Sequence, residues 1–91
     1  MTRRLVITGR VQGVGYRDWL KREARALGLA GWVRNRTDTS VEAVVGGDEA
    51  AIDTLIERAH RGPPAARVEA VAVSDAADAD LPTPFERRPT A

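Results

Sequence analysis

Cysteine is absent from the sequence, and histidine occurs once, as His60. The absence of thiols excludes disulfides, thiolate metal sites and a cysteine nucleophile, and it suits a reducing compartment. A single histidine leaves too few ligands for a histidine-based zinc site and no other histidine for a Ser-His-Asp triad. We expect no metal ion and no cofactor.

Long apolar runs and a surplus of charge are also missing. Leu5, Val6 and Ile7 are followed at once by polar and glycine residues, so the N-terminus lacks the apolar segment of a signal peptide. No apolar run is long enough to span a membrane. Fourteen basic residues against thirteen acidic ones give a net charge of +1, which selects neither nucleic acid nor membrane as a partner. We expect a cytoplasmic protein.

The residues that are present fit one domain over residues 1–91. The chain is 43% hydrophobic and 30% charged, which is typical of a soluble globular protein. Its length is sufficient for one core but not for two, and no repeat or linker divides it.

Three glycines within seven residues mark the stretch Gly9-Arg10-Val11-Gln12-Gly13-Val14-Gly15-Tyr16-Arg17. It follows a short apolar run and precedes a helical pattern, so the backbone must turn tightly here or let another group approach closely. Successive backbone N–H groups before a helix can bind an anion, and Arg17 adds a forked cation. The spacing matches neither the nucleotide P-loop nor the dinucleotide fingerprint. An anion site and a plain strand-to-helix turn both remain open.

The spacing of apolar residues predicts the element order βαββαβ with a short closing strand. One helix is expected after Arg17, with Gly28 as a left-handed cap, and a second after Asp48, stopped by Gly62-Pro63-Pro64. This order predicts an α+β fold, a ferredoxin-like α/β sandwich whose mainly antiparallel sheet carries both helices on one face. Strands are expected over residues 3–8, 29–36, 40–45, 67–74 and 85–88.

Several conspicuous residues have structural explanations. His60 falls in the last turn of the second helix, where the helix dipole favours cations, and Trp19 fits core packing better than ligand stacking. Val68 and Val71 differ in parity, which indicates a bulge or an edge in the fourth strand. Asn35 precedes a hairpin turn and fits turn chemistry. The expected loop over residues 74–84 lacks the glycine and glutamate of a calcium site, so its acids are interpreted as solvated: Asp75, Asp78 and Asp80.

The glycine-rich stretch, followed by Gly31-Trp32-Val33-Arg34-Asn35, resembles the two signatures of the acylphosphatase family. The resemblance continues in order through nearly the whole chain, over Val41-Glu42-Ala43-Val44-Val45-Gly46-Gly47, Gly62-Pro63-Pro64 and Phe85-Glu86-Arg87-Arg88-Pro89.

Two positions depart from the family pattern. Tyr16 stands where the family usually has phenylalanine, and the added hydroxyl is expected to change little. Thr39 follows Asp38 where glycine is usual, which places a β-branched residue in a turn and bears on stability more than on chemistry.

The resemblance implies metal-independent hydrolysis of acyl phosphates to a carboxylate and inorganic phosphate. It implies that Arg17 binds the phosphate and that Asn35 orients the attacking water. Because a carboxylate leaving an acyl phosphate is a weak base, such a site needs no general acid. The backbone amides of the implied phosphate cradle belong to Gln12, Gly13, Val14, Gly15, Tyr16 and Arg17.

Two other classes of function fit the same architecture. An RNA-binding module would stack bases on aromatic residues of the central strands, and residues 5–7 and 41–45 contain none. A channelling domain, of the kind fused within hydrogenase-maturation proteins that handle carbamoyl phosphate, would work with partner domains, and a chain of 91 residues favours the free enzyme. We expect a monomer that binds a small acyl phosphate, with inorganic phosphate as product and inhibitor, and no nucleic acid.

Overall fold

The computed structural model describes residues 1–77 and 80–91. Its elements follow the predicted order, and their ends lie within about two residues of those predicted. They are β1 (Thr2–Arg10), α1 (Tyr16–Ala26), β2 (Ala30–Asn35), β3 (Val41–Gly46), α2 (Glu49–Arg61), β4 (Arg67–Asp75) and β5 (Glu86–Arg88).

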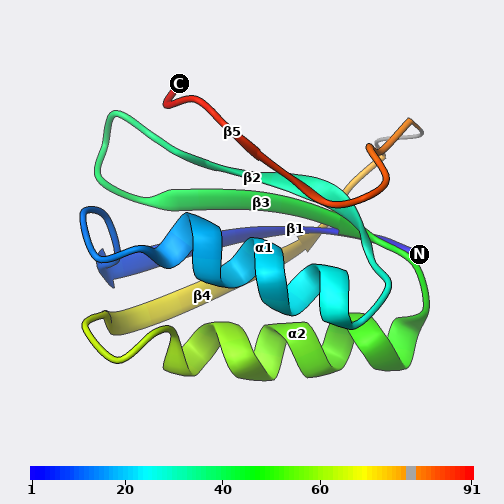
Figure 1. Ribbon diagram of the computed structural model, residues 1–91, viewed down its shortest axis with the longest axis horizontal. Coiled ribbons are helices and arrows are strands. Elements are labelled where there is room, and N and C mark those ends of the chain that lie inside the picture. Colours follow the sequence, from blue (N-terminus) through cyan, green and yellow to red (C-terminus); the bar gives the residue numbers. More distant parts are fainter. Residues whose placement is uncertain (78–79) are drawn as a thin grey trace.

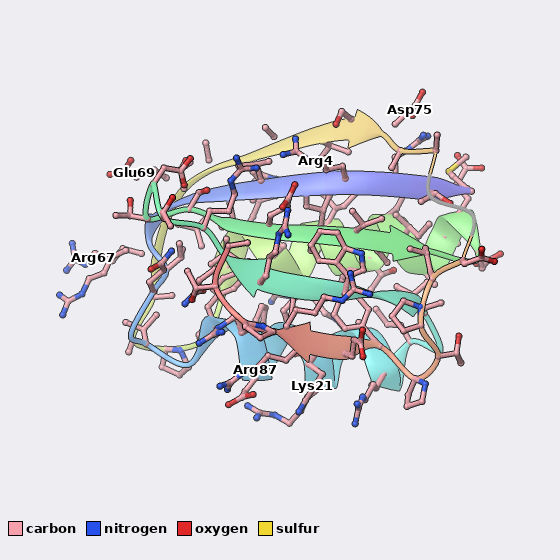
Figure 2. The ribbon with its side chains drawn as sticks, turned by 90° about the horizontal axis from the view of Figure 1, so that it is seen from above. Arg4, Lys21, Arg67, Glu69, Asp75 and Arg87 are labelled. Carbon is pink, nitrogen blue, oxygen red and sulfur yellow. The ribbon has the colours of Figure 1, made fainter. Side chains whose placement is uncertain are left out.

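The five strands form one sheet in the order β4-β1-β3-β2-β5. Strand β1 pairs antiparallel with β3 and β4, strands β2 and β3 form the predicted antiparallel hairpin, and β5 runs parallel to β2. Both helices cover the same face of this sheet (Figure 1), and the opposite face, seen from above in Figure 2, carries no helix formed by the described residues. The predicted ferredoxin-like sandwich is therefore confirmed.

The core lies between the sheet and the helices. Because side chains alternate along a strand, every second residue of β1 and β3 points toward the helices. Each helix contributes one apolar stripe to the same layer, as the spacing predicted. Fully buried members of this core include Leu5, Ile7, Leu20, Ala24, Val41, Ala43, Val45, Ile52, Leu55 and Ala59.

A β-bulge interrupts the pairing of β1 with β4. Thr8 pairs with Ala70 but Gly9 pairs with Val68, so Glu69 is the additional residue. Gly9 has φ 121°, and a Cβ atom there would overlap the Arg67 carbonyl oxygen, so this position needs glycine. The bulge explains the parity change in the fourth strand, and β4 is also an edge strand, so both predicted features are present.

The helix ends follow the predicted capping. Gly28 has φ 70°, its N–H donates to the Arg25 carbonyl at 3.0 Å, and the Leu29 N–H donates to the Ala24 carbonyl at 3.0 Å, which is a Schellman motif. Asp48 caps α2 by accepting from the Ala51 N–H at 3.2 Å. No helix in the described part of the chain is long and apolar enough to cross a membrane.

One loop assignment needs correction. Asp75 was expected to be a solvated loop residue, and its side chain is exposed as expected. It is, however, the last residue of β4, paired across the sheet with Arg3, whose guanidinium forms an ion pair with its carboxylate. Asp80 is exposed, as expected, and Asp78 lies outside the described residues.

Candidate active site

The turn between β1 and α1 presents a series of backbone donors. Gly13 and Gly15 adopt φ 72° and 79°, a left-handed conformation that strains other residues, and Gly15 is the N-cap of α1 without a side chain to cap it. Among the described residues, none of the N–H groups of residues 12–18 donates to a protein acceptor. These donors lie at the positive end of the helix dipole, where an anion is favoured.

A cavity of about 180 Å³ lies beside this turn. It is lined by Asn35, which the family resemblance assigns to the site, and by four of the six residues of the expected cradle. Gln12 and Val14 do not line it. The lining residues are Val11, Gly13, Gly15, Tyr16, Arg17, Asp18, Asn35 and Arg87.

Gln12 links the glycine-rich turn to the β2–β3 hairpin. Its side-chain amide Nε2 donates to the carbonyl oxygens of Arg36 and Ser40, both at 2.8 Å. Because Arg36 directly follows Asn35, this bridge fixes the turn relative to the end of β2. The Gln12 side chain therefore has a positioning role beside whatever its backbone amide binds.

Arg17 and Asn35 approach the cavity from different elements. Arg17 is the second residue of α1, and its Nη1 donates to the Arg88 carbonyl at 3.2 Å, which holds the half-buried guanidinium near β5. Asn35 ends β2, and its main-chain carbonyl accepts from the Ala91 N–H at 3.0 Å. The side chain of Asn35 is buried, and among the described residues its Oδ1 has no hydrogen-bond partner.

An unpaired buried acceptor costs free energy of about 1 to 3 kcal/mol, so folding alone gives no reason to place one here. The hairpin turn does not use it either, because the Ser40 N–H and hydroxyl both donate to Asp38 instead. The explanation of Asn35 by turn chemistry is therefore not supported by the contacts of its side chain.

Three lining residues were not among the predicted site residues: the apolar Val11 and the charged Asp18 and Arg87. Arg87 Nη1 donates to both carboxylate oxygens of Asp18 at 2.9 Å, and this hydrogen bond is the main cause that lowers the pKa of Asp18 below its ordinary value. Asp18 could have been suspected because it adjoins Arg17. Arg87 lies in a stretch that carries the family resemblance, but nothing in that stretch places it beside α1, because the pairing of β5 with β2 brings it there.

Trp32, on the face of the sheet that the helices do not cover, is itself covered by neighbouring side chains and is not free for stacking. Trp32 is only 8% exposed, and the guanidinium groups of Arg34 and Arg88 lie over its ring at 4.9 and 5.0 Å from the ring centre. These cation–π contacts occupy the surface that a base would need. The geometry thus gives no support to the RNA-binding alternative.

The donors of the turn and the guanidinium of Arg17 form a candidate anion site on an α/β sandwich, and the unpaired oxygen of Asn35 lies in the same cavity. The chain belongs to the acylphosphatase family, whose model matches residues 3–86. An acylphosphatase of Rhodopseudomonas palustris is 58% identical over 79 residues, which cover 87% of this chain and 79% of that protein. The crystal structure of an acylphosphatase from Bacillus subtilis matches with a TM-score of 0.90 at 34% identity, covering 96% of this chain and 97% of that one.

A longer protein contains the same architecture. Full-length HypF, in its phosphate- and nucleotide-bound form, matches with a TM-score of 0.87 at 25% identity, covering 98% of this chain but 12% of HypF. The acylphosphatases named above match over most of their own length, and they support an enzyme that hydrolyses acyl phosphates.

Proposed function

We propose that this cavity hydrolyses acyl phosphates with the phosphate held by the backbone amides of residues 12–17 and by Arg17, and with the attacking water oriented by Asn35. In this proposal residues 1–91 act as one monomeric, cytoplasmic domain, and inorganic phosphate is product and inhibitor. The observation that carries the proposal is the unpaired, buried Oδ1 of Asn35 in the cavity that Arg17 also lines.

The proposed reaction needs little covalent chemistry from the protein. The water oxygen forms a bond to phosphorus while the bond from phosphorus to the acyl oxygen breaks, and its electron pair leaves on the carboxylate. The proton lost by the water ends on the phosphate product. Amide donors and the guanidinium stabilise charge on the three oxygens that stay with phosphorus, and Asn35 Oδ1 accepts a hydrogen bond from the water, which orients the water's lone pair toward phosphorus.

The test separates the two side chains by what each one holds. Arg17→Ala should weaken the binding of inorganic phosphate by at least about tenfold, because a charge-assisted hydrogen bond worth about 1.5 to 3 kcal/mol is lost, and kcat should fall further. Asn35→Ala should lower kcat by about a hundredfold. Its affinity for inorganic phosphate should stay within about twofold, because Asn35 holds the water and not the anion. Calorimetric titration with phosphate and steady-state kinetics on benzoyl phosphate give both quantities.

Arg67→Ala is the matched control for the loss of a positive charge, because Arg67 is an exposed residue of β4 at the sheet edge opposite to β5. It should bind phosphate and turn over substrate like the wild type. If Asn35→Ala loses phosphate affinity as severely as Arg17→Ala does, Asn35 is a phosphate ligand and the water-orienting role is wrong.

A channelling role beside partner domains is the second candidate, because this chain also matches a segment of HypF, a longer protein whose structure is described as phosphate- and nucleotide-bound. The two roles differ in whether the isolated chain turns over a free acyl phosphate. Multiple turnovers of benzoyl phosphate by this chain alone support the free enzyme, and phosphate binding without turnover supports the channelling role.

A further inference from the structure

Two guanidinium groups line the same small cavity. Arg17 comes from the first turn of α1, and Arg87 comes from β5. In the proposed function Arg17 and the backbone amides of the turn already bind the phosphate. Arg87 is therefore a second cation in the cavity that the phosphate end of the substrate does not require.

The contacts of Arg87 leave part of its guanidinium available. One of its three nitrogens, Nη1, makes both hydrogen bonds to Asp18. Its other two nitrogens, Nε and Nη2, make no hydrogen bond within the described residues. A guanidinium carries five N–H donors in a planar fork, so three of them lie on the nitrogens that do not contact Asp18. The side chain is 43% exposed, and Figure 2 shows it beside α1.

Asp18 fixes the position of this fork. Its carboxylate lies in the first turn of α1, where the helix dipole favours a negative charge, and the two bonds to Arg87 hold the guanidinium against the helix. Without Arg87 the same carboxylate would repel any anion that entered the cavity. The pair therefore neutralises Asp18 and presents the remaining donors of an oriented cation.

We propose that Arg87 determines specificity at the acyl end of the substrate by binding a second carboxylate, so that the site favours acyl phosphates of dicarboxylic acids. This inference rests on the proposed function, because it assumes that the phosphate occupies the turn at the N-terminus of α1. An acyl group with no charge gains nothing from Arg87. An acyl group with a terminal carboxylate gains a charge-assisted hydrogen bond.

The experiment compares fumaryl monophosphate with crotonyl phosphate. The two acyl groups have the same trans four-carbon chain, and a carboxylate in the first replaces a methyl group in the second. The trans double bond prevents the carboxylate from attacking its own acyl phosphate. For each protein we take the ratio of kcat/KM on fumaryl monophosphate to kcat/KM on crotonyl phosphate. Comparing this fumaryl-to-crotonyl ratio between the wild type and a variant removes the difference in intrinsic reactivity of the two substrates.

In an Asp18→Asn background, where no unpaired carboxylate can repel the substrate, Arg87→Gln should lower the fumaryl-to-crotonyl ratio by about tenfold, the lower limit for loss of a hydrogen bond to a charged group. Arg87→Lys, which keeps the charge but loses the fork, should give an intermediate ratio. Arg67→Gln removes the same charge from a side chain that Figure 2 shows far from Arg87, and it should leave the ratio unchanged. Circular dichroism verifies that each variant is folded.

Different failures have different meanings. If Arg87→Gln leaves the fumaryl-to-crotonyl ratio unchanged, or lowers kcat/KM equally for both substrates, Arg87 does not bind the carboxylate of the acyl group and the inference is wrong. If the wild-type protein hydrolyses neither substrate, the proposed function itself fails. A ratio that falls equally in Arg67→Gln would assign the preference to net charge and would also overturn the inference.

Discussion

The turn between β2 and β3 places Thr39 in a conformation that suits glycine. Thr39 has φ 77°, and it is the sole residue other than glycine with positive φ among those described. A left-handed conformation costs a β-branched residue about 1 to 2 kcal/mol. Thr39→Gly should remove this strain and raise the free energy of unfolding by about 1 kcal/mol, after the larger chain entropy of unfolded glycine is subtracted. Urea denaturation measures the change.

Thr37→Gly is the matched control in the same turn. Thr37 does not have positive φ, so glycine there only adds entropy to the unfolded chain and should lower stability by about 0.5 to 1 kcal/mol. Neither variant should alter kcat, since neither residue lines the cavity. A Thr39→Gly protein less stable than the wild type would show that the threonine stabilises the turn by more than its strain.

The start of α1 and the end of α2 are joined through Tyr16. The Ala59 carbonyl lies four residues before Pro63, which has no N–H, so it cannot make the usual helical bond. The Tyr16 hydroxyl donates to this carbonyl at 2.8 Å in the core. Tyr16→Phe should therefore lower the free energy of unfolding by about 1 to 3 kcal/mol, because a buried acceptor loses its donor. Thermal denaturation at pH 7 measures this loss, and kcat should change little because the backbone amide remains.

Alkaline pH gives a second, independent readout of the same contact. Burial raises the pKa of Tyr16 above its ordinary value of 10.0, so above pH 10 the unfolded chain loses the proton while the folded one keeps it. Wild-type stability should then fall by up to about 1.4 kcal/mol per pH unit, whereas Tyr16→Phe lacks this loss. The difference between the two proteins should narrow above pH 10, and a constant difference would contradict the burial of the neutral phenol. Tyr16 is the only tyrosine in the sequence, so absorbance of tyrosinate reports it alone.

The elements could be predicted because local rules determine them. The apolar stripes, Asp48 and Gly28 mark the helices, and the parity of Val68 and Val71 marks the bulge. The sequence could not show that β5 runs parallel to β2 or that the Tyr16 hydroxyl has a partner in α2, because both are contacts between distant segments. The expectation that the Tyr16 hydroxyl changes little in the protein did not include its hydrogen bond to the Ala59 carbonyl. The Tyr16→Phe variant tests that expectation.

At the scale of the whole molecule, the candidate site was predictable where the two family signatures contain its residues and not where it depends on the pairing of distant segments. The resemblance placed Arg17 and Asn35 in one site, and both line the cavity. Asp18 and Arg87 stand 69 positions apart, and a pattern read along the chain cannot pair them. The roles of these side chains remain predictions until the variants are measured.

The last prediction concerns how the whole molecule supplies positive charge to the substrate. In the proposed function the site supplies it through backbone amides and guanidinium groups, and no cluster of three His, Asp or Glu side chains able to hold a metal occurs in residues 1–77 and 80–91. Hydrolysis of benzoyl phosphate should therefore proceed at the same rate in EDTA as in EDTA saturated with Mg²⁺, the control for ionic strength. Phenethyl phosphate should react slower by several orders of magnitude, because its alkoxide leaving group needs a proton donor that a carboxylate does not. A rate that chelation abolishes and Mg²⁺ restores would mean that a metal ion, and not the protein's own donors, stabilises the charge on the phosphoryl group.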